Sequence, residues 1–213
     1  AIGWGVKLGK GCCPVNPVAW LEIPALKYEV LENLRRAIEL LESNSDLVIN
    51  YVPEVQMNLV MALPKKYAKD VNNVAGVLGR IVRYGNKVKA VGPPTFGASR
   101  HLAKAVLKLM EYHPEIRAAV NIRYSKEVIE VAKRLGYKVS FYDRREEPEE
   151  VKRVEGASIP WGIEAALRRI NYETPDIIYH LGDWGKEPMI NIFGRDALNV
   201  VSKLLRMLKE LKK

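Results

Sequence analysis

The sequence predicts an α/β fold built on a mixed sheet. Segments that read as short strands alternate along the 213-residue chain with segments whose apolar residues recur at helical spacing. A hairpin with Gly85-Asn86 at its turn requires an antiparallel pair of strands, so the sheet is not purely parallel. Apolar residues make up 48% of the chain, which is enough for one substantial core.

The N-terminal quarter divides into an arm and the start of the main domain. The first 26 residues are rich in Gly and Pro and have no hydrophobic period, so we predict an arm or linker over residues 1–26 and one domain over residues 27–213. Apolar spacing predicts an amphipathic helix over residues 27–43, with short strands at residues 47–51 and 57–63.

The hairpin covers residues 79–91. A two-residue turn at Gly85-Asn86 pairs Tyr84 with Lys87, and continuing this register brings Arg80 to the open end of the hairpin. The glycine-bracketed loop that starts at residue 92 begins there, so Arg80 is expected beside it.

Helices and strands continue to alternate through the rest of the chain. The expected helices cover residues 99–113, 125–136, 163–170 and 197–211, and the expected strands cover residues 116–122, 137–142, 176–180 and 188–193. A charged run at residues 144–155 is predicted to be a solvated loop. We find no internal repeat.

The charge and composition of the chain indicate which kind of ligand or partner it binds. The formal charge of +9 suits nucleic acid, an anionic membrane surface or small anionic substrates. The lysines are spread along helices without a basic block, and no apolar run is long enough to span a membrane, so we favour small anions. The only cysteines, Cys12 and Cys13, are neighbours and make no disulfide framework, which favours a reducing cytoplasm. Abundant Lys, Arg and Glu suit a heat-adapted protein.

The loop between Gly92 and Gly97 is the first candidate anion site. It leads into a helix for which Ser99 is the expected N-cap, and Arg100 and His101 lie in the first turn. Free N–H groups and the positive end of the helix dipole would bind a phosphate or pyrophosphate there. The alternative is an ordinary strand-to-helix connection.

A second loop repeats this arrangement. Asn121, Arg123 and Ser125 precede the next expected helix, which would suit a ligand with two separate phosphate groups. An ordinary connection with a surface arginine explains the same residues.

The loop at residues 182–187 is the third candidate. It combines Asp183, Lys186 and Glu187, so Asp183 or Glu187 could hold a Mg²⁺ that bridges a pyrophosphate. A surface turn in which Lys186 pairs with Glu187 is the alternative.

The chain has only three histidines, and no metal-ligand spacing involves them. His113 is expected at a helix end without an active role, and His180 at a strand end is ambiguous. A helix start beside Arg80 favours the neutral form of His101, which would hydrogen-bond or move a proton near neutral pH. No P-loop and no Ser or Cys nucleophile with its partners is evident.

Three runs of sequence carry a family resemblance. They are Gly-Arg-Ile-Val at residues 79–82, Gly-Pro-Pro-Thr-Phe-Gly-Ala-Ser-Arg-His at residues 92–101, and Pro-Asp followed by Gly-Asp-Trp-Gly-Lys-Glu-Pro-Met-Ile within residues 175–190. Together they resemble the ThiN-type thiamine-phosphate synthase domain, from about residue 27 to the C-terminus. The arginine and histidine thought essential in that family fall on Arg80 and His101.

The resemblance implies a reaction and a fold. The reaction joins hydroxymethylpyrimidine diphosphate to hydroxyethylthiazole phosphate and releases pyrophosphate, with Mg²⁺ expected by analogy with other pyrophosphate chemistry. The implied fold is a three-layer αβα sandwich with a mixed, largely antiparallel sheet, similar to the class II aldolase and epimerase architecture.

The resemblance also implies partners and alternatives. Gly9-Lys10-Gly11 and residues 14–17 look like the junction where this domain follows a hydroxymethylpyrimidine phosphate kinase in fused enzymes, although Cys13 replaces an expected Gly. A thiamine-phosphate sensor without turnover and an accessory C-terminal domain of the kinase remain open, as does a homo-oligomer. A phosphosugar aldolase would need a histidine cluster that the sequence lacks.

Overall fold

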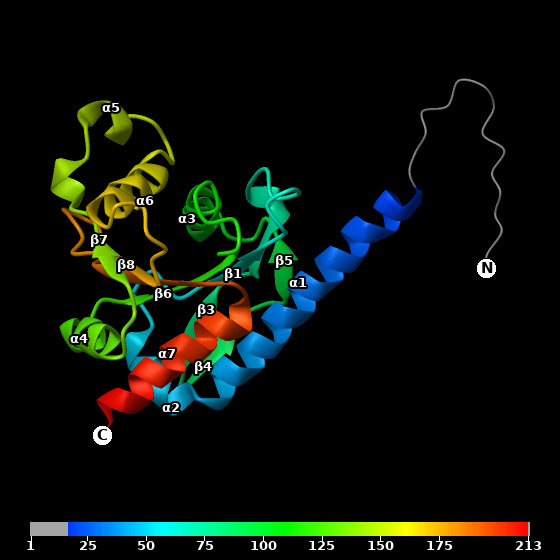
Figure 1. Ribbon diagram of the computed structural model, residues 1–213. Coiled ribbons are helices and arrows are strands. Elements are labelled where there is room, and N and C mark those ends of the chain that lie inside the picture. The colour runs from blue at the N-terminus through cyan, green and yellow to red at the C-terminus, as the bar shows by residue number, and fades with distance from the viewer. Residues whose placement is uncertain (1–16, 213) are drawn as a thin grey trace.

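A computed structural model describes residues 17–212 (Figure 1). Their helices and strands are, in order, α1 (Pro17–Ser43), α2 (Ser45–Val48), η1 (Ile49–Tyr51), β1 (Leu59–Ala62), η2 (Val71–Asn73), β2 (Val74–Val77), β3 (Ile81–Tyr84), β4 (Lys87–Ala90), β5 (Pro94–Phe96), α3 (His101–Leu109), β6 (Ala118–Arg123), α4 (Lys126–Arg134), β7 (Val139–Phe141), η3 (Arg144–Glu146), α5 (Glu149–Lys152), α6 (Ser158–Arg169), β8 (Ile177–His180), β9 (Met189–Gly194) and α7 (Ala197–Leu211). No helix within the described range is both long and apolar enough to cross a bilayer.

A seven-stranded sheet forms the middle layer, in the order β5-β2-β1-β6-β9-β8-β7. Neighbouring strands are antiparallel except for β7 and β8, which are parallel. The longest pairing joins β6 to β9, from Ala118 opposite Gly194 to Arg123 opposite Met189. The predicted class, α/β with a mixed and largely antiparallel sheet, is confirmed.

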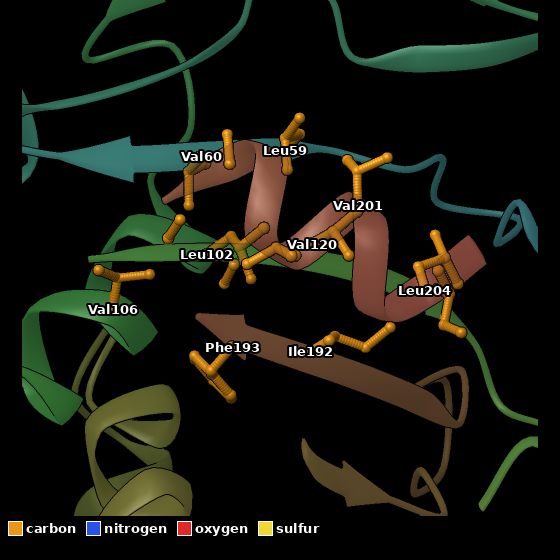
Figure 2. Close-up of a cluster of buried hydrophobic side chains, with 14 of the residues drawn as sticks. Leu59, Val60, Leu102, Val106, Val120, Ile192, Phe193, Val201 and Leu204 are labelled. Atoms are coloured by element: carbon orange, nitrogen blue, oxygen red, sulfur yellow. The ribbon is translucent and has the colours of Figure 1, made fainter. Parts of the chain in front are cut away.

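Helices cover both faces of this sheet. Helices α3 and α6 lie over one face, while α1, α4 and α7 lie over the other (Figure 1). Figure 2 shows apolar side chains from both helical layers gathered around the central strands, among them Leu102 and Val106 of α3 and Val201 and Leu204 of α7. All four are buried, so the sheet holds two helical layers through one continuous core and the three-layer arrangement is confirmed.

The predicted hairpin forms a separate two-stranded sheet from β3 and β4. Its register pairs Tyr84 with Lys87, as the turn length predicts. At the open end, the N–H of Val91 donates to the carbonyl oxygen of Arg80 at 3.0 Å. Turn length alone therefore places Arg80 correctly, at the mouth of the Gly92 loop.

The structure differs from the expected elements in three places. Residues 47–51 were expected as a strand but form helical turns in α2 and η1. Strand β2 was not predicted, because Ala75-Gly76 interrupts its β-branched pattern. Helix α1 begins at Pro17, where proline suits the first helical turn, so residues 17–26 of the predicted arm or linker are helical. The rest of the predicted arm and the kinase-junction motif before Pro17 lie outside the described residues.

The charged run at residues 144–155 is also more ordered than expected. It contains η3 and α5, and it buries Arg144 and Glu147. Their side chains approach to 3.5 Å, which compensates part of the cost of burying two charges. This run therefore belongs partly to the interior and is not simply a solvated loop.

Candidate active site

Four segments meet to form the candidate active site: the turn at residues 53–56, the hairpin base at Arg80, the start of α3 and the loop at residues 182–187. Glu187 ties the last of these to the first, because its Oε1 accepts the N–H of Glu54 at 3.0 Å and its Oε2 accepts the N–H of Val55 at 3.3 Å. The guanidinium of Arg80 donates to the carbonyl oxygen of Val55. One turn thus joins the hairpin base to the C-terminal loop.

The backbone around Arg80 is strained. Arg80 has φ of +71° and Gln56 has φ of +68°, in the left-handed region that residues other than Gly rarely occupy. Gln56 directly precedes Met57, and Arg80 directly precedes Ile81. Met57 and Ile81 form an isolated β-bridge, in which the N–H of Met57 donates to the Ile81 carbonyl oxygen at 3.1 Å and the N–H of Ile81 donates to the Met57 carbonyl oxygen at 2.8 Å. Strain of this kind persists only when the surroundings enforce it, and it concentrates at functional sites.

Two buried asparagines enforce that geometry. The Asn58 side chain accepts the N–H of Val77 at 2.9 Å and donates to its carbonyl oxygen at 3.2 Å. Asn121 accepts the N–H of Asn58 at 2.7 Å and donates to the Gln56 carbonyl oxygen and the Met189 sulfur. Asn121 was predicted to bind substrate, but both of its amide hydrogens are used within the protein. The Asn121 side chain therefore has a structural role, because it holds the turn at residues 53–56 in position.

The Gly92 loop reaches α3 differently from the prediction. Ser99 is not the N-cap: Arg100 occupies that position with helical φ and ψ, and no side chain caps the helix. Ser99 instead packs on β2, where a Cβ placed on Gly76 would lie 3.1 Å from the Ser99 Cβ. Gly97, with φ of +79°, makes the turn before it. The first-turn N–H groups of α3, where His101 begins the helix, therefore have no side-chain cap.

The pKa of His101 responds to the charges of nearby cations. Partial burial lowers its pKa most, and the positive charges of Arg80, Lys104 and Lys186 lower it further. The hairpin, α3 and the C-terminal loop thus bring four basic side chains together. The predicted neighbourhood of Arg80 and His101 is present. Lys104 was missed, although its place three residues after His101 puts it on the same face of α3.

The C-terminal loop is a closed turn. Asp183 and Lys186 exchange two backbone hydrogen bonds, at 3.2 and 2.7 Å, with Trp184 at the tip and 99% exposed. A Cβ on Gly182 would come within 2.2 Å of the Lys186 carbonyl oxygen, so this position requires Gly. The Gly182 N–H donates to Nδ1 of His180 at 3.1 Å. His180 therefore anchors the loop that carries Lys186.

Arg123 lies between two cavities. One has a volume of about 580 Å³ and is lined by the 53–56 turn, Arg123, Tyr124 and the loop residues Gly185 and Glu187. The other, of about 330 Å³, shares Glu54 and Arg123 and adds residues of the hairpin, including Arg83. No hydrogen bond or ion pair joins the Arg123 guanidinium to the rest of the described chain.

Ser125 has a clear local role. It caps α4 by accepting the N–H of Val128 at 3.2 Å, as predicted, and its hydroxyl donates to the Glu127 carboxylate at 2.5 Å. That carboxylate lies in the first turn of α4 and would compete with a phosphate there. Asn121 and Ser125 of the second predicted anion site thus make hydrogen bonds within the protein. Arg123 is the residue of that site whose side chain remains available to bind a ligand.

Metal ligands are sparse. Within residues 17–212 no three His, Cys, Asp or Glu side chains are grouped so that they could hold a metal ion. Glu187 uses both carboxylate oxygens to join two loops, which argues against it as a ligand. Asp183 uses Oδ1 to accept the N–H of Trp184 at 2.8 Å. Of the two predicted candidates, Asp183 is therefore the one whose second carboxylate oxygen makes no hydrogen bond within the described residues.

Comparison with known proteins identifies the family. The family model "Thiamine-phosphate synthase ThiN" matches residues 33–206. The chain is 43% identical over 185 residues to "Thiamine-phosphate synthase ThiN" of Methanothermobacter thermautotrophicus, covering 85% of this chain and 95% of that protein. It is 41% identical over 181 residues to "Bifunctional thiamine biosynthesis protein ThiDN" of Methanocaldococcus jannaschii, covering 84% of this chain but 40% of that protein. A crystal structure of the C-terminal domain of phosphomethylpyrimidine kinase matches with a TM-score of 0.81 and 56% identity, covering 85% of this chain and 99% of that one. The chain belongs to the thiamine-phosphate synthase ThiN family.

Proposed function

We propose that this chain joins hydroxymethylpyrimidine diphosphate to hydroxyethylthiazole phosphate, forming thiamine phosphate and pyrophosphate. The observation that carries the proposal is that Arg80 and Lys186 lie near enough to His101 for their charges to lower its pKa, at a helix start with no side-chain cap, in a member of this family. A leaving pyrophosphate needs such a set of cations and N–H donors.

The chemistry assigns a task to each group. Departure of pyrophosphate breaks a carbon–oxygen bond and leaves a cation stabilised by the pyrimidine, which the thiazole nitrogen then captures. The protein must therefore stabilise charge on the leaving group and orient two rings. Arg80, Lys186 and the start of α3 would bind the pyrophosphate. Because its pKa is lowered, His101 is mostly neutral near neutral pH and would donate a hydrogen bond to the leaving oxygen.

The second substrate would use the Arg123 cavities. Their volumes, about 580 and 330 Å³, lie in the range of small-ligand sites. Arg123 would bind the thiazole phosphate, since it is a free cation between them. The 53–56 turn lines both cavities and also contacts Arg80, so the two phosphate groups would bind on either side of one turn.

A magnesium ion is part of the proposal. When bound, it would neutralise charge on the pyrophosphate. Asp183 would be its single protein carboxylate, which suits an ion that commonly keeps waters and binds mainly through substrate phosphates. Loss of activity on chelation and its recovery with added Mg²⁺ would test this, and full activity after chelation would contradict it.

Turnover is the direct test. The chain is incubated with both substrates and Mg²⁺, and thiamine phosphate is measured. Arg80→Ala and His101→Ala should each lower kcat roughly a hundredfold or more with little change in KM, because the lost group acts on charge that develops in the transition state.

A matched control separates catalysis from folding. His113 lies beyond the far end of α3, where it contacts the Tyr172 carbonyl oxygen at 3.0 Å, so His113→Ala should affect the melting temperature but not kcat. A folded His101→Ala protein with normal turnover would refute the catalytic role. Ligand binding without any turnover would favour the alternative, a thiamine-phosphate sensor.

We also propose that a kinase domain precedes this one in the full-length protein. The bifunctional relative, of which this chain covers 40%, motivates that part of the proposal. Sequencing the reading frame upstream of the segment that encodes Ala1 tests it. An accessory role in such a fusion would show as loss of kinase activity when this domain is removed from the full-length protein.

A further inference from the structure

Lys104 has an ammonium group that is held by a segment distant in sequence. It lies one turn after His101 on α3, and its Nζ donates to the carbonyl oxygen of Gly156 at 3.2 Å. A Cβ placed on Gly156 would come within 1.8 Å of that Nζ, and Gly156 has φ of +78°, which other residues rarely adopt. The segment before α6 therefore leaves a space that the Lys104 ammonium fills.

Two helix starts also lie near this ammonium. Lys104 meets Gly156, just before α6, and Lys108 one turn later meets Glu164 within α6 at 3.0 Å. Helices α3 and α6 thus run side by side in the same direction, and their N-terminal ends lie together. Neither helix start has a side-chain cap, so two positive dipole ends adjoin the Lys104 ammonium.

Lys104 also retains hydrogen-bonding capacity. An ammonium has three N–H donors, and one is used by the Gly156 carbonyl oxygen. No carboxylate within residues 17–212 pairs with Lys104, whereas Lys108 on the same helix pairs with Glu111 and Glu164. The charge of Lys104 is close enough to lower the pKa of His101.

We propose that Lys104 is a further pyrophosphate-binding residue and that Gly156 fixes its position beside His101. The inference rests on the proposed function for the identity of the anion. Lys104 would direct its two free N–H donors at the phosphate oxygens, while the Gly156 carbonyl oxygen keeps the side chain from extending into solvent. Gly156 acts as a positioning residue and would not touch the ligand.

Calorimetric titration with inorganic pyrophosphate tests the proposal directly. Lys104→Met should weaken pyrophosphate binding roughly tenfold or more, since a hydrogen bond between charged groups is lost. Gly156→Ala keeps the charge but displaces the flexible ammonium, so it should weaken binding to a smaller extent. Lys133→Met is the matched control, because Lys133 is exposed on α4 over the opposite face of the sheet and should leave binding unchanged.

Histidine NMR gives a second readout that a merely structural role would not move. The chain has three histidines, so the His101 titration can be resolved. Lys104→Met should raise the pKa of His101, because one of the charges that lowers it is removed. Pyrophosphate binding equal to that of the parent protein in Lys104→Met, with an unshifted His101, would overturn the inference.

The outcomes also separate this inference from the proposed function. If the parent chain makes no thiamine phosphate but its pyrophosphate binding depends on Lys104, the proposed function fails and the anion site stands. If the parent chain is active and Lys104→Met is unimpaired in binding, the function stands and the role of Lys104 is refuted. Should Lys104→Met fail to fold, Gly156→Ala decides by the same titration.

Discussion

His180 should make the protein sensitive to acid, since it is 7% exposed and its neutral Nδ1 accepts the Gly182 N–H. Burial, and then the positive charge of Arg144, lowers its pKa from 6.5 to about 4. The Tyr142 ring also packs against it, at 5.1 Å between centroids, and Glu147 pairs with Arg144. None of these favours a protonated imidazole enough to offset its burial.

The loss of stability at low pH can be calculated from the linkage between proton binding and folding. The unfolded chain takes up this proton at a higher pH than the folded chain, so stability falls as pH falls between the two pKa values. At about 1.4 kcal/mol for each pKa unit, the shift from 6.5 to about 4 corresponds to roughly 3 kcal/mol. That contribution is complete above pH 6.5 and is lost progressively as the pH falls to about 4.

Urea unfolding at about pH 7 and about pH 4.5 measures this loss. His180→Asn keeps an acceptor near the position of Nδ1 but does not titrate. The decrease in unfolding free energy between the two pH values should be about 2.5 kcal/mol smaller in His180→Asn than in the parent protein. Carboxylates that titrate in the same range are common to both proteins and cancel. Equal pH dependence in the two proteins would refute this account.

Three further outcomes are expected. Arg123→Ala should raise KM for the thiazole substrate several-fold more than KM for the pyrimidine substrate, and equal effects on both would remove its assignment. Trp184, 99% exposed on the loop that we expect to close over ligands, should report binding by fluorescence; a full signal in Trp184→Phe would contradict loop closure. Ser125→Ala removes the observed cap of α4 and should lower the free energy of unfolding by about 1 kcal/mol in urea titrations, with no loss expected if the cap contributes nothing.

Local rules predicted the part of the site that depends on local geometry. The two-residue turn set the hairpin register, and the register placed Arg80 at the Gly92 loop. The cap at Ser125 was recognised because it depends on a side chain three residues from its partner. These features needed no knowledge of the sheet.

The features that sequence reasoning missed depend on contacts between distant segments. Ser99 has the right chemistry for an N-cap, but packing against β2 uses it elsewhere. Asn58 gave no local signal, since its partners include Asn121, 63 residues away. The Lys104 contact with Gly156 spans 52 residues. Residues 47–51 have strand propensity, and their helical conformation shows that tertiary packing overrode it.

The bonds from Glu187 to the 53–56 turn join positions 133 and 132 residues apart, so the assembled site belongs to the folded state alone. Substrate or product that binds there binds only folded molecules and therefore shifts the folding equilibrium toward the folded state. A ligand at a hundred times its Kd would add roughly 2.7 kcal/mol to the free energy of unfolding. In a cell that maintains its thiamine precursors, the abundance of this protein would then follow the supply of its own ligands, because the unliganded fraction is the one exposed to unfolding and proteolysis.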